Sequence, residues 1–369
     1  MPAKHIGQLC RRCNALEAAL TVRAEPLCRE CFAKYVHTKV VKRMEAFRTR
    51  HVGAGQERKL LLPMSFGVSS VTLLHILDKH LETQRQKTGR TGFSIHVLHV
   101  RSIGTKDFSK QMEALKKRYP DHEYSTIDLH DLFENKQDLD TILTSLPSAT
   151  SASDILTILR TRLTVRCAKS HNCEGILNSH STTALAERIL STTALGRGFS
   201  LPWQVLDGPS PYGIPMYYPM RDVLKKELLS HAQIVLPDLQ TFIDPAAFVG
   251  TKAPPSAKNT TIDALMRGYF EDVEEGYPSI VSNVVKTAGK LQVPVERESD
   301  VVCKLCVLPV AQESLGIAGW GGHQEDEGEG EQGNGSGLCY GCSRSLPLEL
   351  VGSLPWDTII SRSPGMKKC

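Results

Sequence analysis

Four Cys-x-x-Cys pairs, two near each end, constrain the fold of this 369-residue chain more than any other feature. Two residues between a pair of thiolates allow both sulfurs of a tight turn to face one ion, and two such turns complete a tetrahedral site. Without a secretory signal, the pairs indicate metal ligation rather than disulfide bonds. A closed shell of four thiolates is structural, so we predict two Zn²⁺ sites. Their ligands are Cys10, Cys13, Cys28 and Cys31 at one end and Cys303, Cys306, Cys339 and Cys342 at the other.

The second cysteine group has a longer spacer than the first. Fourteen residues separate Cys13 from Cys28, whereas 32 separate Cys306 from Cys339. The longer spacer contains residues 323–337, which hold five acidic side chains and none that could pack into an apolar core. We expect a disordered insertion here, which the site tolerates because loop-closure entropy grows slowly with length. The alternative is a swapped arrangement, in which cysteine pairs from the two ends share an ion.

The overall composition is ordinary for a soluble globular protein, with 41% hydrophobic and 23% charged residues. No apolar stretch approaches the roughly 20 residues that a transmembrane helix needs. The first residues also lack the apolar core of a secretory signal. We therefore expect a cytosolic or nuclear protein, with the cytoplasm as the predicted location and no membrane contact.

Positive charge is concentrated at the N-terminus, where residues 1–59 hold 13 Lys or Arg against 5 Glu, a net charge of +8. Apolar residues at intervals of 4, 4 and 3 predict a helix over 34–50. This apolar stripe consists of Val36, Val40, Met44 and Phe47. Basic side chains occupy other positions of the helix, among them Lys39, Lys42 and Arg43. A basic helix beside a zinc module suggests a nucleic-acid surface, although an ordinary solvated face explains the charge equally well.

Between the cysteine groups, strand and helix patterns alternate. The predicted strands span residues 60–64, 93–100, 124–129 and 175–178, and the predicted helices span 69–83, 106–119, 153–170 and 182–195. Alternation of this kind predicts a parallel sheet covered by helices on both faces. In such α/β sheets, ligands bind at the carboxyl ends of the strands, near the switch in strand order.

The turn after the first of these strands lies at that position. An apolar run ends there at a small-residue turn and an apolar helix pattern follows, which is the outline of a phosphate-binding loop. Such a loop needs small residues so that the backbone can approach phosphate closely. This chain carries Phe66 instead.

The six residues 65–70 resemble the Ser-Gly-Gly-x-Asp-Ser loop of the PP-loop ATPase superfamily. Ser65, Gly67 and Ser70 match, whereas Phe66 replaces the first Gly and Ser69 replaces the Asp. From the first cysteine pair to the last, the chain resembles the cytoplasmic tRNA 2-thiolation protein 2 family more closely. The segments that carry this resemblance are Leu9-Cys-Arg-Arg-Cys13, Cys28-Arg-Glu-Cys31-Phe, Ser65-Phe-Gly-Val-Ser-Ser70, Ser181-Thr-Thr-Ala-Leu-Ala-Glu-Arg188, Ala194-Leu-Gly-Arg-Gly198, Tyr218-Pro-Met-Arg-Asp222 and Cys339-Tyr-Gly-Cys342.

The resemblance implies an α/β fold with a parallel-sheet PP-loop domain, of the adenine nucleotide alpha hydrolase type, flanked by zinc-ribbon-like modules. The domains expected from it are an N-terminal zinc module over 1–33, a basic linker helix over 34–59, a degenerate PP-loop domain over 60–250, a helical linker over 251–300 and a C-terminal zinc module over 301–369.

The resemblance also implies a function. Members of the family act in the cytosolic complex that places sulfur at C2 of the wobble uridine of tRNAs of the Lys, Glu and Gln type. The implied partners are a catalytic paralogous thiolase subunit in a heterodimer, the tRNA, and a thiocarboxylated ubiquitin-related modifier that carries the sulfur.

Departures from the catalytic pattern favour a non-catalytic subunit. Besides the changed loop, residues 147–153 lack the thiol that catalytic relatives carry, and Thr182 and Thr183 replace an acidic pair. We therefore expect weak or lost ATP binding at Ser65, Gly67 and Ser70, and no catalytic residue. We expect the chain to retain contacts with RNA. The residues predicted for it are Lys39, Lys42, Arg43, Arg160 and Arg197.

Two other functions stay open at this point. In the first, the chain itself binds ATP and adenylates tRNA as a sulfurtransferase. In the second, it is a zinc adaptor in protein conjugation by the ubiquitin-related modifier and has no RNA role.

Overall fold

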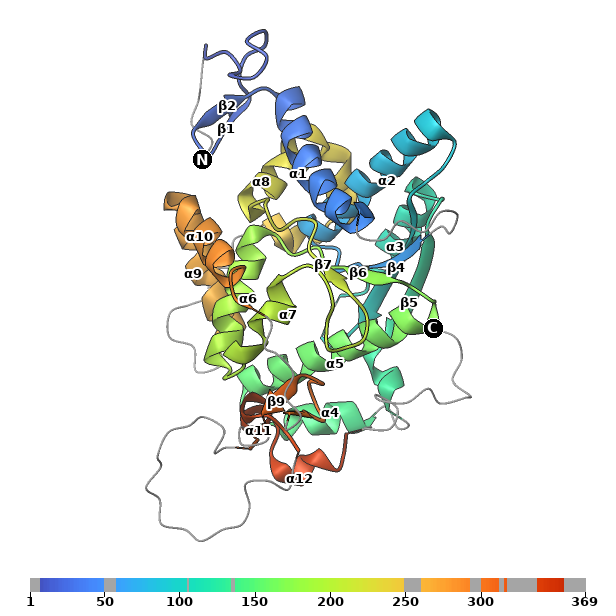
Figure 1. The fold of residues 1–369 in the computed structure, drawn as a ribbon, viewed down its shortest axis with the longest axis vertical. Coiled ribbons are helices and arrows are strands. Elements are labelled where there is room, and N and C mark those ends of the chain that lie inside the picture. Colours follow the sequence, from blue (N-terminus) through green and yellow to red (C-terminus); the bar gives the residue numbers. More distant parts are fainter. Residues whose placement is uncertain are drawn as a thin grey trace.

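A computed structural model describes residues 7–49, 58–104, 106–133, 137–248, 260–292, 300–311, 315–316 and 337–354. Within these residues, an α/β core stands between two small cysteine-bearing modules. The N-terminal module lies at the top of Figure 1 and the C-terminal module at the bottom. Residues 323–336 of the expected acidic insertion lie outside the described residues.

The strands are short except in the middle of the core sheet. In chain order they are β1 (Leu20–Val22), β2 (Glu25–Leu27), β3 (Arg58–Pro63), β4 (Phe93–Arg101), β5 (Glu123–Asp128), β6 (Gly175–Leu177), β7 (Met216–Tyr217), β8 (Asp300–Val302) and β9 (Pro309–Ala311).

The helices alternate with the core strands and continue beyond them. They are α1 (Arg29–Thr49), α2 (Val68–Thr88), α3 (Ser109–Arg118), α4 (Gln137–Thr144), α5 (Ala149–Ser170), α6 (Thr182–Ala194), α7 (Leu201–Val205), α8 (Lys225–Ser230), α9 (Ile262–Gly276), α10 (Pro278–Ala288), α11 (Tyr340–Ser345) and α12 (Leu348–Val351). Four 3₁₀ turns, η1 (Leu129–Leu132), η2 (Gly198–Ser200), η4 (Pro237–Phe242) and η5 (Pro245–Phe248), and a π-turn, η3 (His231–Val235), complete the set.

The core sheet has five strands in the order β5-β4-β3-β6-β7, and all its neighbours are parallel. This confirms the predicted α/β class with a parallel sheet. The order places β3 in the centre, with Leu60 between Ile95 of β4 and Gly175 of β6. The chain adds β4 and β5 on one side of β3 and then β6 and β7 on the other. The switch in strand order therefore falls between β3 and β6, where α/β sheets bind ligands.

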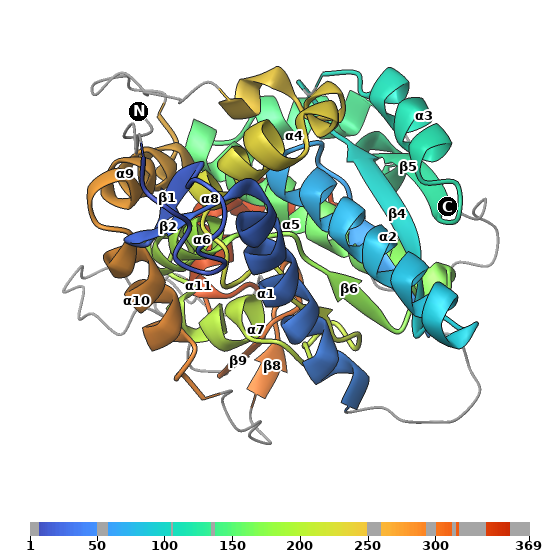
Figure 2. The ribbon, with the colours of Figure 1, turned by 90° about the horizontal axis from the view of Figure 1, so that it is seen from above.

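The two faces of the sheet belong to two apolar clusters, because successive side chains of a strand point to opposite faces. Leu60 and Leu62 of β3 join the cluster that contains α1 and α2, whereas Leu61 joins the one that contains α5 and α6. All three leucines are fully buried. Figure 2 shows α1 and α2 together over one face of the sheet.

Helix α1 joins the N-terminal module to the core. Its predicted apolar stripe is confirmed at Val36, Val40 and Met44, which are buried against the core, while the side chain of Phe47 lies outside the described residues. The ring of Phe32, in the first turn of α1, meets the ring of His231 edge-on, with 6.0 Å between centroids. The N-terminal module is thus docked on the core through packed side chains.

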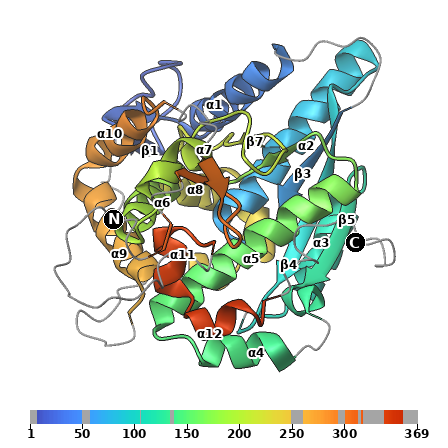
Figure 3. The same cartoon turned by 60° about the horizontal axis from the view of Figure 1, so that its bottom comes forward.

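The C-terminal part of the chain packs on the other face of the core. Helices α9 and α10 pack against α6, and α11 packs against α5. In Figure 3, α11 and α12 lie beside α4 and α5. The antiparallel pair β8–β9 and α11 carry the second cysteine group between them. None of the described helices has the length and apolar character required to cross a bilayer.

Candidate metal centres and the loop after β3

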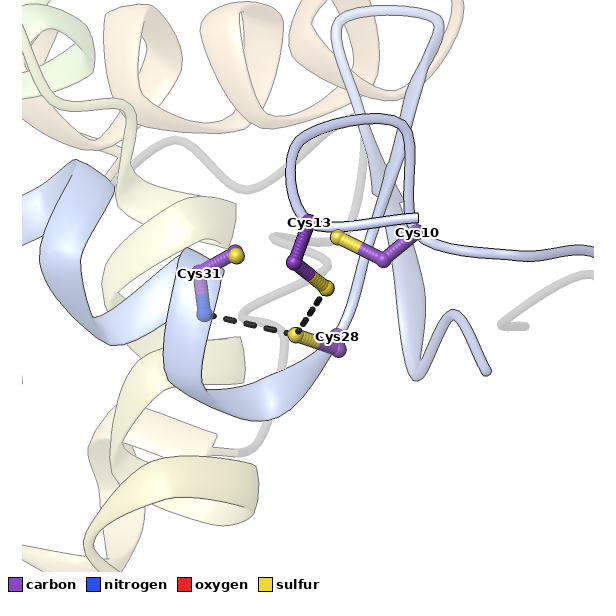
Figure 4. Close-up of side chains that lie close together, drawn as sticks. All are labelled: Cys10, Cys13, Cys28 and Cys31. Carbon is purple, nitrogen blue, oxygen red and sulfur yellow. Dashed lines mark hydrogen bonds between the residues drawn. The ribbon is translucent and has the colours of Figure 1, made fainter. Parts of the chain in front are cut away.

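The four N-terminal cysteines form one cluster, drawn in Figure 4. Cys10 precedes a turn that carries Cys13, Cys28 follows β2, and Cys31 lies in the first turn of α1. Their four sulfurs all lie within 4.8 Å of one another, and the Cys13 and Cys28 sulfurs are 3.8 Å apart. The backbone N–H of Cys31 points at the Cys28 sulfur, at 3.5 Å. This is the N–H to thiolate contact that a Cys-x-x-Cys turn provides to a bound metal.

The four C-terminal cysteines form a second cluster of the same size. The sulfurs again lie within 4.8 Å of one another, with 3.8 Å between Cys306 and Cys339. The backbone N–H of Cys339 donates to the Cys303 sulfur at 3.2 Å. Each cluster is built from cysteines of one end of the chain, so the swapped arrangement is wrong. Both groups that the sequence predicted are therefore brought together and could each hold a metal ion.

Burial distinguishes the two clusters. Cys13 is exposed and Cys31 is partly exposed, whereas every cysteine of the C-terminal cluster is buried. A shell of four thiolates around Zn²⁺ carries net negative charge, and burying such charge is costly unless a counter-charge is near. The C-terminal cluster has one, because Nη1 of the buried Arg197 approaches the Cys342 sulfur at 3.8 Å.

Arg197 belongs to a buried polar network between α5 and the C-terminal module. Its Nη2 forms an ion pair with Asp154, and Ser345 Oγ donates to the other oxygen of the same carboxylate at 2.6 Å. Nearby, Nη1 of Arg162 donates to the carbonyl oxygens of Lys304 and Leu305, both at 2.8 Å. These two carbonyls lie between Cys303 and Cys306. The second cysteine group is therefore fixed to α5 by two buried arginines.

The loop after β3 carries a large aromatic side chain where the superfamily pattern has a glycine. Phe66 is fully buried and has a left-handed backbone, with φ of 58°. Its ring stacks on Phe108 with 4.7 Å between centroids and meets His99 edge-on at 4.9 Å. The carbonyl oxygen of Phe66 accepts a hydrogen bond from the Asp244 N–H at 2.8 Å. Phe66 thus fills the space beside the loop and ties it to a later segment.

The loop residues that match the superfamily pattern bond to one another. Ser65 Oγ and Ser70 Oγ are 3.2 Å apart, and Ser70 Oγ donates to the Gly67 carbonyl at 3.1 Å. Gly67 is the N-cap of α2 and makes no side-chain capping bond. The serines therefore close the turn between β3 and α2, which accounts for their presence without a ligand.

Thr182 and Thr183, at the positions of the acidic pair in catalytic relatives, also have structural partners. Thr182 Oγ1 donates to the Arg221 carbonyl at 2.7 Å, and Thr183 Oγ1 donates to Glu274 of α9 at 2.9 Å. The backbone N–H of Lys225 donates to Thr183 Oγ1 at 2.9 Å. Both hydroxyls hold neighbouring segments together.

The residues predicted to contact RNA do not form one patch. On α1, Lys39 donates to the Asp222 carbonyl at 2.7 Å and Arg43 pairs with the Asp222 carboxylate at 2.6 Å, while Lys42 is exposed. The other two come from the far side of the core. They are Arg160, on α5, and Arg197, after α6.

The position of Arg197 contradicts the prediction that this residue contacts RNA. Its side chain is buried, and its guanidinium is engaged by Asp154 and the Cys342 sulfur, so it is not available to a phosphate at the surface. The sequence interpretation missed Asp154 and Asp222, the carboxylates that engage these cations. Asp222 lies within one of the segments that carry the family resemblance. Asp154 carried no signal, since nothing in the sequence pairs it with a residue 43 positions later.

Two isolated cysteines behave as predicted. Cys167 and Cys173 are buried, unpaired by disulfides and outside both clusters. Burial raises the pKa of the Cys173 thiol to about 11, which keeps it protonated at neutral pH. They are best described as small core side chains.

The sheet order, with a four-cysteine group at each end, defines an α/β protein with a central parallel sheet between two candidate metal modules. The solved structure of the U34-tRNA thiolase NcsA from Methanococcus maripaludis, with its 4Fe–4S cluster, shares this fold. The match has a TM-score of 0.60 and covers 86% of this chain and 96% of that chain, at 16% identity. Within this class, the chain belongs to the cytoplasmic tRNA 2-thiolation protein 2 family.

Full-length relatives establish this membership. Cytoplasmic tRNA 2-thiolation protein 2 of Phaeosphaeria nodorum is 48% identical over 375 residues, which cover 94% of this chain and 98% of the relative. The protein of the same name in Pyrenophora tritici-repentis is 46% identical over 376 residues, with the same coverage. The sequence model of the family matches residues 261–344, which include α9, α10 and the second cysteine group.

Proposed function

We propose that this chain is a non-catalytic subunit of the cytoplasmic complex that 2-thiolates the wobble uridine of tRNAs of the Lys, Glu and Gln type. In this proposal it works as a heterodimer with a catalytic paralogous thiolase, and the sulfur comes from a thiocarboxylated ubiquitin-related modifier. Family membership supports the pathway, since the relatives are named for tRNA 2-thiolation in the cytoplasm. The non-catalytic role rests on the loop after β3.

The buried ring of Phe66 is the observation that carries the non-catalytic role. A phosphate loop works by presenting free backbone N–H groups to oxyanions. Here a fully buried phenyl ring, stacked on Phe108, occupies the side of the loop. Ser69 also lacks the carboxylate that could organise Mg²⁺ with the nucleotide. The loss of both features supports a loop that serves only as a turn.

Zn²⁺ is the metal that best fits both clusters. Four sulfurs at about 2.3 Å from a tetrahedral ion are separated by about 3.8 Å. This is the separation between Cys13 and Cys28 in one cluster and between Cys306 and Cys339 in the other. A 4Fe–4S cluster places a separate iron behind each thiolate and spreads the sulfurs farther apart. The spacing therefore supports single ions with a structural role.

The basic residues of α1 support the tRNA contact in this proposal. Lys42 is exposed, and Lys39 and Arg43 lie on the same helix, held by Asp222. Lysine and arginine contacts to phosphate provide affinity and salt dependence rather than sequence choice. Arg160 remains a candidate on the opposite side of the core, and Arg197 is left out because it is buried.

The test is to co-purify the chain with its catalytic paralogue and to assign ATP binding to each subunit by photocrosslinking with an azido-ATP. We expect label on the paralogue alone and tRNA thiolation only by the pair. A Phe66→Gly/Ser69→Asp variant of this chain should leave the rate of thiolation per folded heterodimer unchanged, with the folded fraction measured by circular dichroism. Label on this chain, or pyrophosphate exchange by this chain alone in the presence of tRNA, would overturn the non-catalytic role.

A further inference from the structure

A cavity of about 540 Å³ lies between helices of the core and the C-terminal module. It is walled by α5, α6, the N-terminal turn of α9 and the segment after β6, and Cys306 and Leu308 of the C-terminal module line it too. Its volume is in the range of small-molecule sites. His180, three residues after β6, lines it from the carboxyl end of that strand. Through His180 the cavity thus reaches the carboxyl end of β6, on one side of the switch in strand order.

Polar and charged groups line this cavity. Among them are the half-buried side chains of Arg160 and Glu187. Nδ1 of His180 is buried and has no hydrogen-bond partner among the described residues. Buried polar groups in proteins are normally satisfied, so this nitrogen beside a cavity points to a missing partner.

The charges around the cavity define the chemistry of that ligand. Four arginines line it, and Arg197 is engaged by Asp154. The remaining three arginines, Arg160, Arg188 and Arg267, face two carboxylates, those of Glu187 and Asp263. An arginine such as Arg160 in the wall of a cavity suits a phosphate, because its planar guanidinium offers several N–H donors in a fixed arrangement.

Glu187 and His180 provide a second kind of contact. Burial raises the pKa of Glu187 to about 7, against the opposing charges of Lys225 and Arg267. This carboxyl group is thus able to donate or accept a hydrogen bond near neutral pH. Burial also lowers the pKa of His180 to about 3, so its imidazole is neutral. Neutral donors and acceptors suit the edge of a nucleobase, and Tyr212 provides an aromatic side chain in the lining of the cavity.

We propose that this cavity binds one nucleotide of an RNA strand, with its phosphate on Arg160 and its base edge on Glu187 and His180. This deepens the proposed function, because it rests on tRNA as the partner and names a place for it. A nucleotide within RNA and a free nucleotide share the same recognisable chemistry, a phosphate and a base. RNA is the source we infer, because one guanidinium suits a single phosphodiester. The polyphosphate of ATP needs a glycine-rich loop, in which this chain carries Phe66 instead of a glycine.

The experiment measures binding of a 5′-fluorescein-labelled hexauridylate to the full-length chain by fluorescence anisotropy. We expect Arg160→Gln to weaken binding at least tenfold and Glu187→Ala at least threefold. The matched control is Lys116→Gln on α3, an exposed lysine away from the cavity, which should change affinity less than twofold. Unlabelled UMP and ATP are added as competitors at the same concentrations, and we expect neither to displace the hexamer at concentrations near its dissociation constant.

A second measurement keeps the proposal testable if a variant folds poorly. A hexamer with one 4-thiouridine, irradiated on the wild-type chain, should crosslink to peptides of α5, α6 or the segment after β6. Crosslinks confined to α1, or equal affinities for wild type and Arg160→Gln, would contradict binding of the RNA in the cavity. Binding of ATP in preference to the hexamer, lost in Arg160→Gln, would overturn RNA as the source. If the proposed function itself were wrong, the result would be different, because tRNA would then bind neither this chain nor its complex.

Discussion

Phe66 combines a strained backbone with a large buried ring. A left-handed conformation costs a non-glycine residue about 1–2 kcal/mol, and this residue has φ of 58°. Burial of a phenylalanine side chain contributes about 1.5–3 kcal/mol, with more from ring pairs. The ring contacts with Phe108 and His99 therefore offset the strain. The residue that replaces a glycine of the superfamily loop therefore stabilises the shape of this one.

Truncation of this side chain tests that balance. Phe66→Ala should lower the free energy of unfolding by about 3–5 kcal/mol, because it leaves a cavity and keeps the strained backbone. Phe66→Gly is the matched control, since it removes the same ring but adopts positive φ freely. It should therefore be more stable than the alanine variant by roughly 1 kcal/mol. Urea unfolding followed by circular dichroism measures both. An alanine variant as stable as wild type would show that the ring does not support the loop.

Arg197 gives a second prediction at this scale. Its removal leaves the buried Asp154 carboxylate without its cation, and breaking a buried pair in this way costs about 3–5 kcal/mol. Arg197→Ala should therefore destabilise the chain strongly and weaken retention of the C-terminal metal, measured by zinc content after dialysis against a mild chelator. The Arg197→Ala/Asp154→Ala double variant should lose less than the sum of the single variants. Strict additivity would contradict a direct pairing between the two side chains.

Among the elements, α1 packs on one buried histidine, His231, and a second buried histidine, His75, lies in α2. Burial lowers the pKa of His231 to about 4, and burial also lowers that of His75 to about 4. The ring of His231 meets Phe32 of α1, and Nδ1 of His75 lies 2.9 Å from the Tyr119 hydroxyl. Protonation of His231 therefore opposes the packing between α1 and the core, and protonation of His75 opposes its burial against Tyr119.

The direction of the pH effect follows from proton binding. Between the unfolded pKa of about 6.5 and the folded value, the unfolded chain binds more protons, so stability is lost as pH falls through this window. We expect each histidine to reduce the free energy of unfolding by on the order of 1–2 kcal/mol between pH 7 and pH 5. Urea unfolding at both pH values measures the loss, and His231→Phe should diminish it. An unchanged pH dependence in that variant would remove His231 from the explanation.

The element pattern was predictable where a periodic run was long. The leucines of β3 and the branched residues of β4 predicted strands that the structure confirms, and the apolar stripe of α1 predicted a helix that it also confirms. Strand β7 was missed because two residues, Met216 and Tyr217, show no period, and its place is set by pairing with β6. Likewise, the cysteine spacing predicted both clusters, but the cavity depends on α5, α6 and α9 meeting in space, which no local pattern encodes.

At the scale of the whole molecule, the two clusters lie at opposite ends of an elongated chain and differ in their attachment (Figure 1). The N-terminal cluster has an exposed ligand, Cys13, and precedes a helix that leads into the core. The C-terminal cluster is buried, and Arg162 binds the carbonyls between two of its ligands. Loss of metal should therefore have local consequences at one end and reach the core at the other.

A mercurial titration tests this difference, with zinc release followed by a colorimetric chelator and folding by circular dichroism. A thiol reagent reaches an exposed thiolate first, so we expect two phases of about one ion each, and only the slow phase should coincide with loss of core helix signal. Cys13→Ser should abolish the fast phase, whereas Cys173→Ser, which alters a buried cysteine outside both clusters, should retain both. Release of both ions in one phase would contradict the different burial, and helix loss in the fast phase would show that the N-terminal cluster also supports the core.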